Sequence, residues 1–231
     1  MYINGKKMNI LALDTSDEVF SAALSTKNGF WSTEIDSGAK HSELLMECAD
    51  SLLKYAGIKQ NELSLIACMR GPGSFTGLRI GFSTAKGLGM ALSIPITSVP
   101  TLDCLAYSFK FWPGIILPTI DAKKSCFFSA LYRGKERLCE DMDASSETIF
   151  AELKKHMISA EEPVLITGSG AELLYPLLSP FFPEIKIDSC ARKGRSRELI
   201  EIAKCCIIQN SNNLDSGPVY IRKSDAELNR K

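Results

Sequence analysis

Two apolar runs that each end in an aspartate begin two similar series of predicted elements, and this recurrence constrains the fold more than any other feature. Residues 9–15 read NILALDT, and residues 115–121 read IILPTID. Each run is followed by alternating apolar and small polar residues, which predict further strands, and then by apolar residues at helical spacing. The same order of elements is therefore predicted in both halves, although their sequences are not repeats of each other.

In the first half we predict strands over 9–15, 18–26 and 29–36, a helix over 41–56, a strand over 63–69, a helix over 74–92, a strand over 94–99 and a short helix over 100–109. In the second half we predict strands over 115–121, 126–132 and 137–142, a helix over 145–156, a strand over 164–167, a helix over 171–178, a strand over 185–187 and a helix over 196–209. The boundary falls near residue 108, which gives domains of residues 8–108 and 109–231.

A βββαβαβα unit used twice is the plan of the ribonuclease-H-like folds of the actin-like ATPase superfamily, which includes sugar kinases and Hsp70-type ATPases. We therefore expect an α/β protein of two packed ribonuclease-H-like subdomains, the second one reduced. In such pairs a nucleotide lies near the first strands, which end in an acid. A fold of this kind does not by itself assign a function.

Composition excludes several classes of protein. The 231 residues carry 27 basic and 27 acidic side chains, so a net charge of zero argues against a stand-alone electrostatic binder of nucleic acid or anionic membranes. Eight cysteines without a C-x-x-C pair favour a reducing cytoplasm, and two histidines without H-E-x-x-H predict no metal site. No apolar run reaches the roughly 18 residues of a membrane span, and residues 1–7 resemble a leader outside the fold.

Polar and glycine-rich strand ends are the candidate ligand sites. Asp14, Thr15 and Ser16 place a carboxylate and two hydroxyls at one strand end, where they could orient Mg²⁺ or a phosphate. The alternative is an Asx or Ser turn into the next strand. The same two interpretations apply to the turn at Asp121, and the GSG sequence that begins at Gly168 could approach a phosphate or simply form a turn.

The sequence GPGSFTG at residues 71–77 lies between a predicted strand and a predicted helix. Backbone N–H groups at such a helix start could bind an anion. The alternative is a tight turn in which Ser74 caps the helix. Neither the P-loop pattern nor the G-x-S-x-G nucleophile elbow is present.

Small residues recur every four positions along the helix predicted over 74–92, at Gly73, Gly77, Gly81, Ala85 and Gly89. Each glycine inside a helix costs up to about 1 kcal/mol relative to alanine. A close backbone approach would offset that cost. The approaching element is either the protein's own sheet or a helix of a partner protein.

A basic run at residues 192–197, RKGRSR, is either a solvated loop or a contact for RNA. Four charges within six residues more often lie in a solvated loop. The run therefore assigns no nucleic-acid site by itself.

Five stretches together resemble the bacterial TsaB (YeaZ) family, and GPGSFTGLRIG is the most specific sequence among them. The resemblance covers essentially the whole chain after residue 7. The stretches are ILALDTS (10–16), KHSELL (40–45), MRGPGSFTGLRIGFSTAKGLGMAL (69–92), IDAKKSCFFSALY (120–132) and PVYIR (218–222).

The resemblance implies a non-catalytic relative of TsaD, the metal-carrying enzyme that transfers a threonylcarbamoyl group to a tRNA adenosine. It implies pairing with a TsaD-like transferase, association with a TsaE-like ATPase through the complex, and contact with tRNA only within the complex. The metal-ligand positions of TsaD fall at about Thr101 and Leu105, which are not useful metal ligands. No catalytic residue, metal or cofactor is therefore expected, nor any membrane contact.

The same resemblance implies that the helices over 41–56 and 74–92 form the partner interface, and that they form a homodimer when TsaD is absent. The candidate interface residues are His41, Leu44, Leu45, Cys48, Leu52, Ser74, Gly77, Gly81 and Ala85.

Two other functions remain as alternatives. An independent actin-like ATPase or small-molecule kinase is suggested by Asp14 and the glycine-rich turns. A peptidase is a weaker alternative, because no nucleophile–base pair or zinc-ligand set is visible in the sequence.

Overall fold

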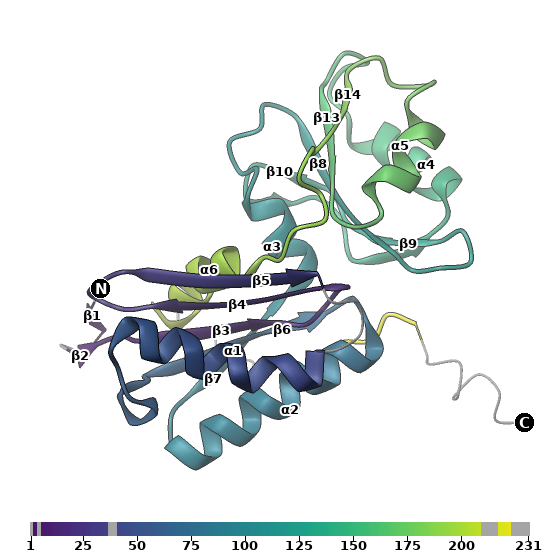
Figure 1. Cartoon of the computed structure of the whole chain (residues 1–231). Coiled ribbons are helices and arrows are strands. Elements are labelled where there is room, and N and C mark those ends of the chain that lie inside the picture. Colours follow the sequence, from purple (N-terminus) through teal and green to yellow (C-terminus); the bar gives the residue numbers. More distant parts are fainter. Residues whose placement is uncertain (1, 4–5, 37–40, 209–216, 223–231) are drawn as a thin grey trace, which may run out of the picture. The chain divides into compact units, whose positions relative to one another are not determined.

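The computed structural model describes residues 2–3, 6–36, 41–208 and 217–222 (Figure 1). The contacts divide the chain into two compact units. Unit 1 consists of Met1–Thr101 with Gly194–Val219, and unit 2 of Leu102–Lys193 with Tyr220–Lys231. In this division unit 1 ends at Thr101 and not near residue 108, and it also contains residues 194–219, which lie beyond the expected boundary.

Unit 1 is built on a five-stranded sheet with the order β5-β4-β3-β6-β7. The central strand β3 pairs antiparallel with β4 and parallel with β6. All five residues of β3 are buried, as expected for an apolar run covered on both faces. The strands are β3 (Ile10–Asp14), β4 (Val19–Ser25), β5 (Phe30–Asp36), β6 (Leu65–Gly71) and β7 (Ile96–Pro100).

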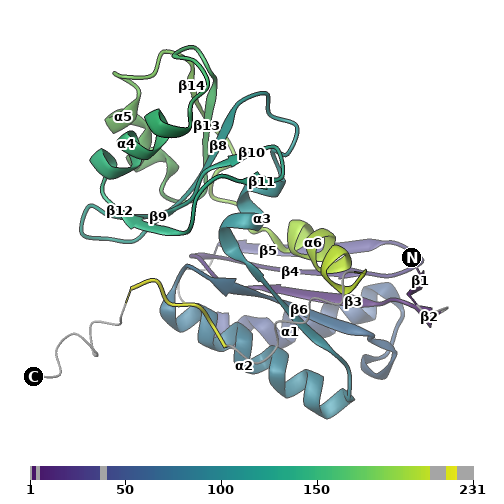
Figure 2. The same cartoon turned by 180° about the vertical axis from the view of Figure 1, so that it is seen from behind.

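Helices cover both faces of this sheet. Helices α1 (His41–Ala56) and α2 (Phe75–Leu92) lie on one face, and α6 (Ser196–Ile208) lies on the other, as Figures 1 and 2 show. Helix α1 contacts β4 and β5, α2 contacts β6 and β7, and α6 contacts β3, β4, β6 and β7. The expected leader contains two short strands, β1 (Tyr2–Ile3) and β2 (Lys6–Lys7), which pair with each other. A 3-10 turn spans Gln60–Glu62.

Unit 2 has a seven-stranded sheet of mostly short strands centred on β8, with the order β11-β10-β8-β13-β14 and with β9 joining β8 to β12. Strand β8 is parallel to β13 and antiparallel to β10. The strands are β8 (Ile115–Asp121), β9 (Phe127–Ser129), β10 (Tyr132–Arg133), β11 (Glu136–Arg137), β12 (Met142–Ala144), β13 (Val164–Thr167) and β14 (Ile185–Ile187). The helices are α3 (Thr101–Tyr107), α4 (Ser146–His156) and α5 (Ala171–Leu178).

Two strands predicted as continuous, over 126–132 and 137–142, are each divided in the structure. Strands β9 and β10 both pair with β8, but the second neighbour changes from β12 at β9 to β11 at β10. Local alternation of apolar residues cannot reveal such a change of partner, since it depends on residues distant in the sequence.

Candidate functional site

Strand β3 ends in a buried carboxylate whose two oxygens both accept hydrogen bonds from this chain. Asp14 Oδ1 accepts from Ser16 N (3.1 Å) and Ser16 Oγ (2.7 Å), and Oδ2 accepts from Arg195 N (2.8 Å). Asp14 is only 4% exposed. That burial raises the pKa of Asp14 above its ordinary value, against the opposing effect of its hydrogen bonds. The geometry supports the Asx-turn interpretation rather than an open metal or phosphate site.

The next two residues of this turn connect it to the start of α2. Thr15 Oγ1 donates a hydrogen bond of 2.7 Å to Gly77 O, and Ser74 N donates one of 2.7 Å to Ser16 O. Thr15 and Ser16 are both buried. The candidate residues at the end of β3 therefore hold the helix against the sheet.

The glycine-rich loop before α2 is a tight turn with a capped helix start. A Cβ at Gly73 would lie 2.3 Å from Ser16 O, so a side chain there would collide with the β3 turn. Ser74 is the N-cap residue of α2, because its Oγ accepts a hydrogen bond of 3.2 Å from Gly77 N. Of the two interpretations of this loop, the contacts support the capping turn.

The ridge of small residues on α2 faces this protein's own sheet. A Cβ at Gly77 would lie 2.0 Å from Thr15 O, and one at Gly81 would lie 2.4 Å from Thr15 Oγ1. Ala85 is fully buried in the core of unit 1. The close approach that offsets the glycine cost is therefore made by the end of β3, the first of the two alternatives above.

Most residues expected at a partner interface lie in the interior of unit 1. The apolar stripe of α1 belongs to the same core as α2 and the sheet, so these side chains are not available on the surface. Leu44 is half-buried and Ser74 is exposed, whereas the side chain of His41 lies outside the described residues. The interior residues are Leu45, Cys48, Leu52, Gly77, Gly81 and Ala85.

Other apolar side chains of the same two helices remain on the surface. Met46 and Tyr55 are exposed on α1, and Met90 near the end of α2 is 80% exposed. Periodicity alone did not single them out, because they lie outside the buried apolar stripes of the two helices.

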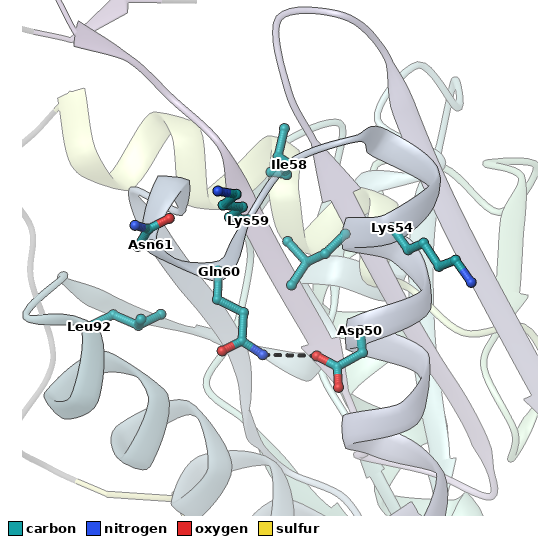
Figure 3. A pocket seen from close by; sticks show the side chains of 8 residues that line it. Asp50, Lys54, Ile58, Lys59, Gln60, Asn61 and Leu92 are labelled. Atoms are coloured by element: carbon teal, nitrogen blue, oxygen red, sulfur yellow. Dashed lines mark hydrogen bonds between the residues drawn. The ribbon is translucent and has the colours of Figure 1, made fainter.

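A shallow hollow of about 620 Å³ lies beside the ends of α1 and α2 (Figure 3). Gln60 Nε2 donates a hydrogen bond of 2.9 Å to Asp50 Oδ1 at its edge. The hollow lacks a convergent set of acids, bases or nucleophiles among its lining residues. These are Asp50, Leu53, Lys54, Ile58, Lys59, Gln60, Asn61 and Leu92.

The candidate turns of unit 2 are also formed by internal contacts. Asp121 accepts hydrogen bonds from Lys123 N (2.7 Å) and Lys123 Nζ (2.8 Å). Burial acts to raise the pKa of Asp121, but the bonds and charge of Lys123 outweigh it, so this pKa is lowered. Gly168 has φ +96°, and a Cβ there would lie 2.4 Å from Thr119 O. Gly168 thus permits a close packing contact, and no open ligand site is formed by it.

Thr101 and Leu105, where the resemblance puts the metal ligands of TsaD, are both buried. No group of three or more His, Cys, Asp or Glu side chains that could hold a metal occurs in the described part of the chain. The chemistry of these residues does not fit a metal centre there.

Sequence reasoning missed a cluster of polar residues in unit 2. Tyr132 Oη donates a hydrogen bond of 2.6 Å to Asp103 Oδ1, and Arg137 bonds to both Asp103 and Asp141. Burial, followed by the charge of Asp103, raises the pKa of Tyr132. The residues come from different elements, so no spacing rule could have found them. Their mutual bonds indicate a structural network that fixes the β10–β11 hairpin to α3.

The basic run at 192–197 is largely bound to unit 1. Gly194 N donates a hydrogen bond of 3.0 Å to Glu34, and the Arg197 guanidinium lies 4.0 Å from the centre of the Phe30 ring. Arg195 is buried, and its backbone N–H bonds Asp14. The expectation of a solvated loop fits Arg192, Lys193 and Arg197, whose side chains are exposed, but not the buried Arg195.

None of the helices in the described ranges combines the length and apolar character needed to cross a bilayer.

Comparison of the sequence with known proteins identifies its family. The family model for TsaD, tRNA N6-adenosine threonylcarbamoyltransferase, matches residues 35–203. A protein of Bacillus subtilis named tRNA threonylcarbamoyladenosine biosynthesis protein TsaB is 34% identical over 72% of this chain and 73% of its own length. Proteins of the same name from Haemophilus influenzae and Escherichia coli are each 32% identical, and their alignments span 57% of each relative.

Solved structures agree with the fold prediction. YeaZ from Pseudomonas aeruginosa superposes with a TM-score of 0.78 and 25% identity, over 93% of this chain and all of that one. A Bacteroides thetaiotaomicron protein described as having an actin-like ATPase fold superposes with a TM-score of 0.50 at 12% identity over 89% of this chain and all of that one, which bears on the fold alone. The prediction of an actin-like, ribonuclease-H-like α/β fold is confirmed.

Proposed function

The chain belongs to the TsaB (YeaZ) family of tRNA threonylcarbamoyladenosine biosynthesis proteins, and from this membership we propose that it is a non-catalytic subunit that pairs with a TsaD-like transferase. A TsaE-like ATPase joins through the complex, and tRNA is modified there. The chain alone forms a homodimer. The proposal places the protein in the cytoplasm.

The hydrogen bonds accepted by the Asp14 carboxylate are the observation that supports the non-catalytic part of this proposal. A catalytic or metal-binding aspartate needs a free oxygen facing substrate or ion. Both oxygens of Asp14 instead accept bonds from Ser16 and Arg195 in a buried turn. The alternative of an independent ATPase or small-molecule kinase gains no support from this turn.

The exposed sides of α1 and α2 are the proposed contact with the transferase and with a second copy. The two helices lie on the same face of the sheet (Figure 1) and contact each other. Their inner sides form the core, so only the outer side chains can reach a partner. Met46 on α1 and Met90 on α2 are apolar residues on that outer surface, and exposed apolar side chains favour association.

Reconstitution tests the proposed function. We expect no modified tRNA when this chain is mixed with tRNA and threonylcarbamoyl-adenylate alone, because the residues that the structure describes include no metal-ligand cluster and the Asp14 carboxylate is fully bonded. Adding the TsaD-like and TsaE-like proteins of the same organism should give product, measured as threonylcarbamoyladenosine by mass spectrometry of digested tRNA. Product from the chain alone, or equal product from the other two proteins without it, would overturn the proposal.

Charge insertion tests the proposed interface. Met46→Glu and Met90→Glu should each weaken binding to the TsaD-like protein by at least about tenfold, because a carboxylate would be buried without a partner. Binding is measured by isothermal calorimetry, with circular dichroism as the check that the chain is folded. Leu173→Glu, at an exposed apolar position of α5, is the matched control and should bind normally. Unchanged affinity in both interface variants would place the contact elsewhere.

A further inference from the structure

Unit 2 exposes a large aromatic side chain in the turn that follows α3. Phe111 is 88% exposed, whereas its neighbours Phe109 and Trp112 pack against buried residues of the unit. Trp112 Nε1 also donates a hydrogen bond of 3.3 Å to Pro163 O. The turn is therefore anchored on both sides of Phe111, which leaves this ring in solvent on a fixed backbone.

Lys110 lies between this ring and Tyr107, and a second lysine lies near Tyr107. The Nζ of Lys110 lies 3.9 Å from the ring centre of Tyr107 and 5.5 Å from that of Phe111. The Nζ of Lys135, on the β10–β11 turn, lies 5.8 Å from the ring centre of Tyr107. A Cβ on Gly134 would lie 3.4 Å from Lys110 O, which shows how closely that turn approaches. We call Tyr107, Lys110, Phe111 and Lys135 the aromatic–basic patch.

The charges of this patch are available to a ligand. Neither lysine forms a salt bridge in the described part of the chain, and their close contacts are with aromatic rings. The carboxylate of Asp103, on the same helix as Tyr107, bonds Tyr132 and Arg137, and Glu136, which follows Lys135 in the hairpin, is exposed. The patch therefore presents one ammonium group beside the exposed Phe111 ring and a second beside the ring of Tyr107.

Unpaired nucleic acid matches this chemistry. An exposed ring can stack on a base of any sequence, and lysines beside it can contact the flanking phosphates. A paired duplex offers phosphates but conceals its base faces, so it could use only the lysines. The zero net charge of the chain means that any such contact is local and weak by itself.

We propose that the aromatic–basic patch is a stacking site for an unpaired base of the tRNA on which the complex acts. The identity of the RNA rests on the proposed function. The RNA-binding surface belongs to unit 2 and includes no residue of α1 or α2. Phe111 stacks on the base, and Lys110 and Lys135 contact phosphates on either side.

Fluorescence anisotropy with the full chain tests this proposal without any catalytic step. The probes are a labelled stem-loop RNA and a fully paired duplex RNA at low salt. We expect tighter binding to the stem-loop. Phe111→Ala should weaken binding to the stem-loop about tenfold and leave duplex binding unchanged. Lys110→Ala and Lys135→Ala should weaken both and should each reduce the salt dependence by the equivalent of about one phosphate contact.

Matched controls come from the same unit. Phe181→Ala removes another exposed phenylalanine, and Lys155→Ala removes another exposed lysine. Both should leave RNA binding unchanged. The proposal is wrong if the native chain does not bind the stem-loop, if Phe111→Ala binds it as well as the native chain, or if the patch binds anionic lipid vesicles instead of RNA. A native chain that pairs with TsaD and supports product formation but does not bind the stem-loop would overturn this proposal alone. A native chain that binds the stem-loop but does not pair with TsaD would overturn the proposed function alone.

Discussion

Gly77→Ala is expected to lower the free energy of unfolding by about 3 kcal/mol, the largest effect that we predict for a single methyl group in this chain. The added Cβ would lie 2.0 Å from Thr15 O. Neither side can yield easily, because Thr15 Oγ1 bonds the carbonyl of Gly77 and Ser74 N bonds the carbonyl of Ser16. Helix α2 would have to move off the end of β3 and lose these bonds.

Gly87→Ala on the same helix is the matched control. Nothing lies within 4 Å of a Cβ at Gly87, which is exposed. Alanine has the higher helix propensity, so this variant should be more stable by up to about 1 kcal/mol. Urea denaturation followed by circular dichroism measures both. Equal midpoints for the two variants would show that the ridge on α2 is not packed as described.

Glu162→Ala is expected to destabilise unit 2 by about 2–3 kcal/mol. Glu162 is 8% exposed, and its Oε1 accepts hydrogen bonds from Arg133 Nε (3.0 Å) and Nη2 (2.9 Å). Its Oε2 accepts one of 2.7 Å from Ile158 N. Removal of the carboxylate leaves a partly buried guanidinium and a backbone N–H without this acceptor. The partial exposure of Arg133 keeps the cost at the lower end of the range for buried pairs.

The surface pair Glu184–Lys186 supplies the control for that variant. Its side chains are about half exposed and their charged atoms lie 3.7 Å apart, so Glu184→Ala should change stability by no more than about 0.5 kcal/mol. Thermal and urea unfolding measure the difference. In a double-mutant cycle, Arg133→Ala should cost much less in the Glu162→Ala background than in the native chain. Additive effects would refute the ion pair.

Local periodicity predicted most elements of this fold. The helix predicted over 41–56 coincides with α1, and the strand predicted over 9–15 contains β3. These elements succeed because burial on one face imposes a period of 3.6, and burial on both faces gives a continuous apolar run. The glycine-rich start of α2 was also recognisable, since a serine cap acts within three residues.

The sequence could not predict which neighbour each helix face or loop would contact. A ridge of small residues requires a close neighbour, but its spacing is the same whether that neighbour is Thr15 or a partner helix. Arg195 reads as part of a solvated basic run, yet its N–H bonds a carboxylate 181 positions earlier. Such contacts depend on topology, which leaves no short-range pattern. The same reason explains why the aromatic–basic patch, built from the end of α3 and two separate turns, was not foreseen.

The discontinuity of unit 1 has a consequence for the order in which the protein can be made. Helix α6 covers one face of a sheet whose last strand ends at Pro100, but α6 begins only at Ser196. A ribosome that adds about 5–20 residues per second needs roughly 5–20 s to synthesise the intervening chain. During that interval the nascent sheet lacks the cover of α6 and exposes apolar surface, so this face is where a chaperone that binds emerging chains would find its substrate.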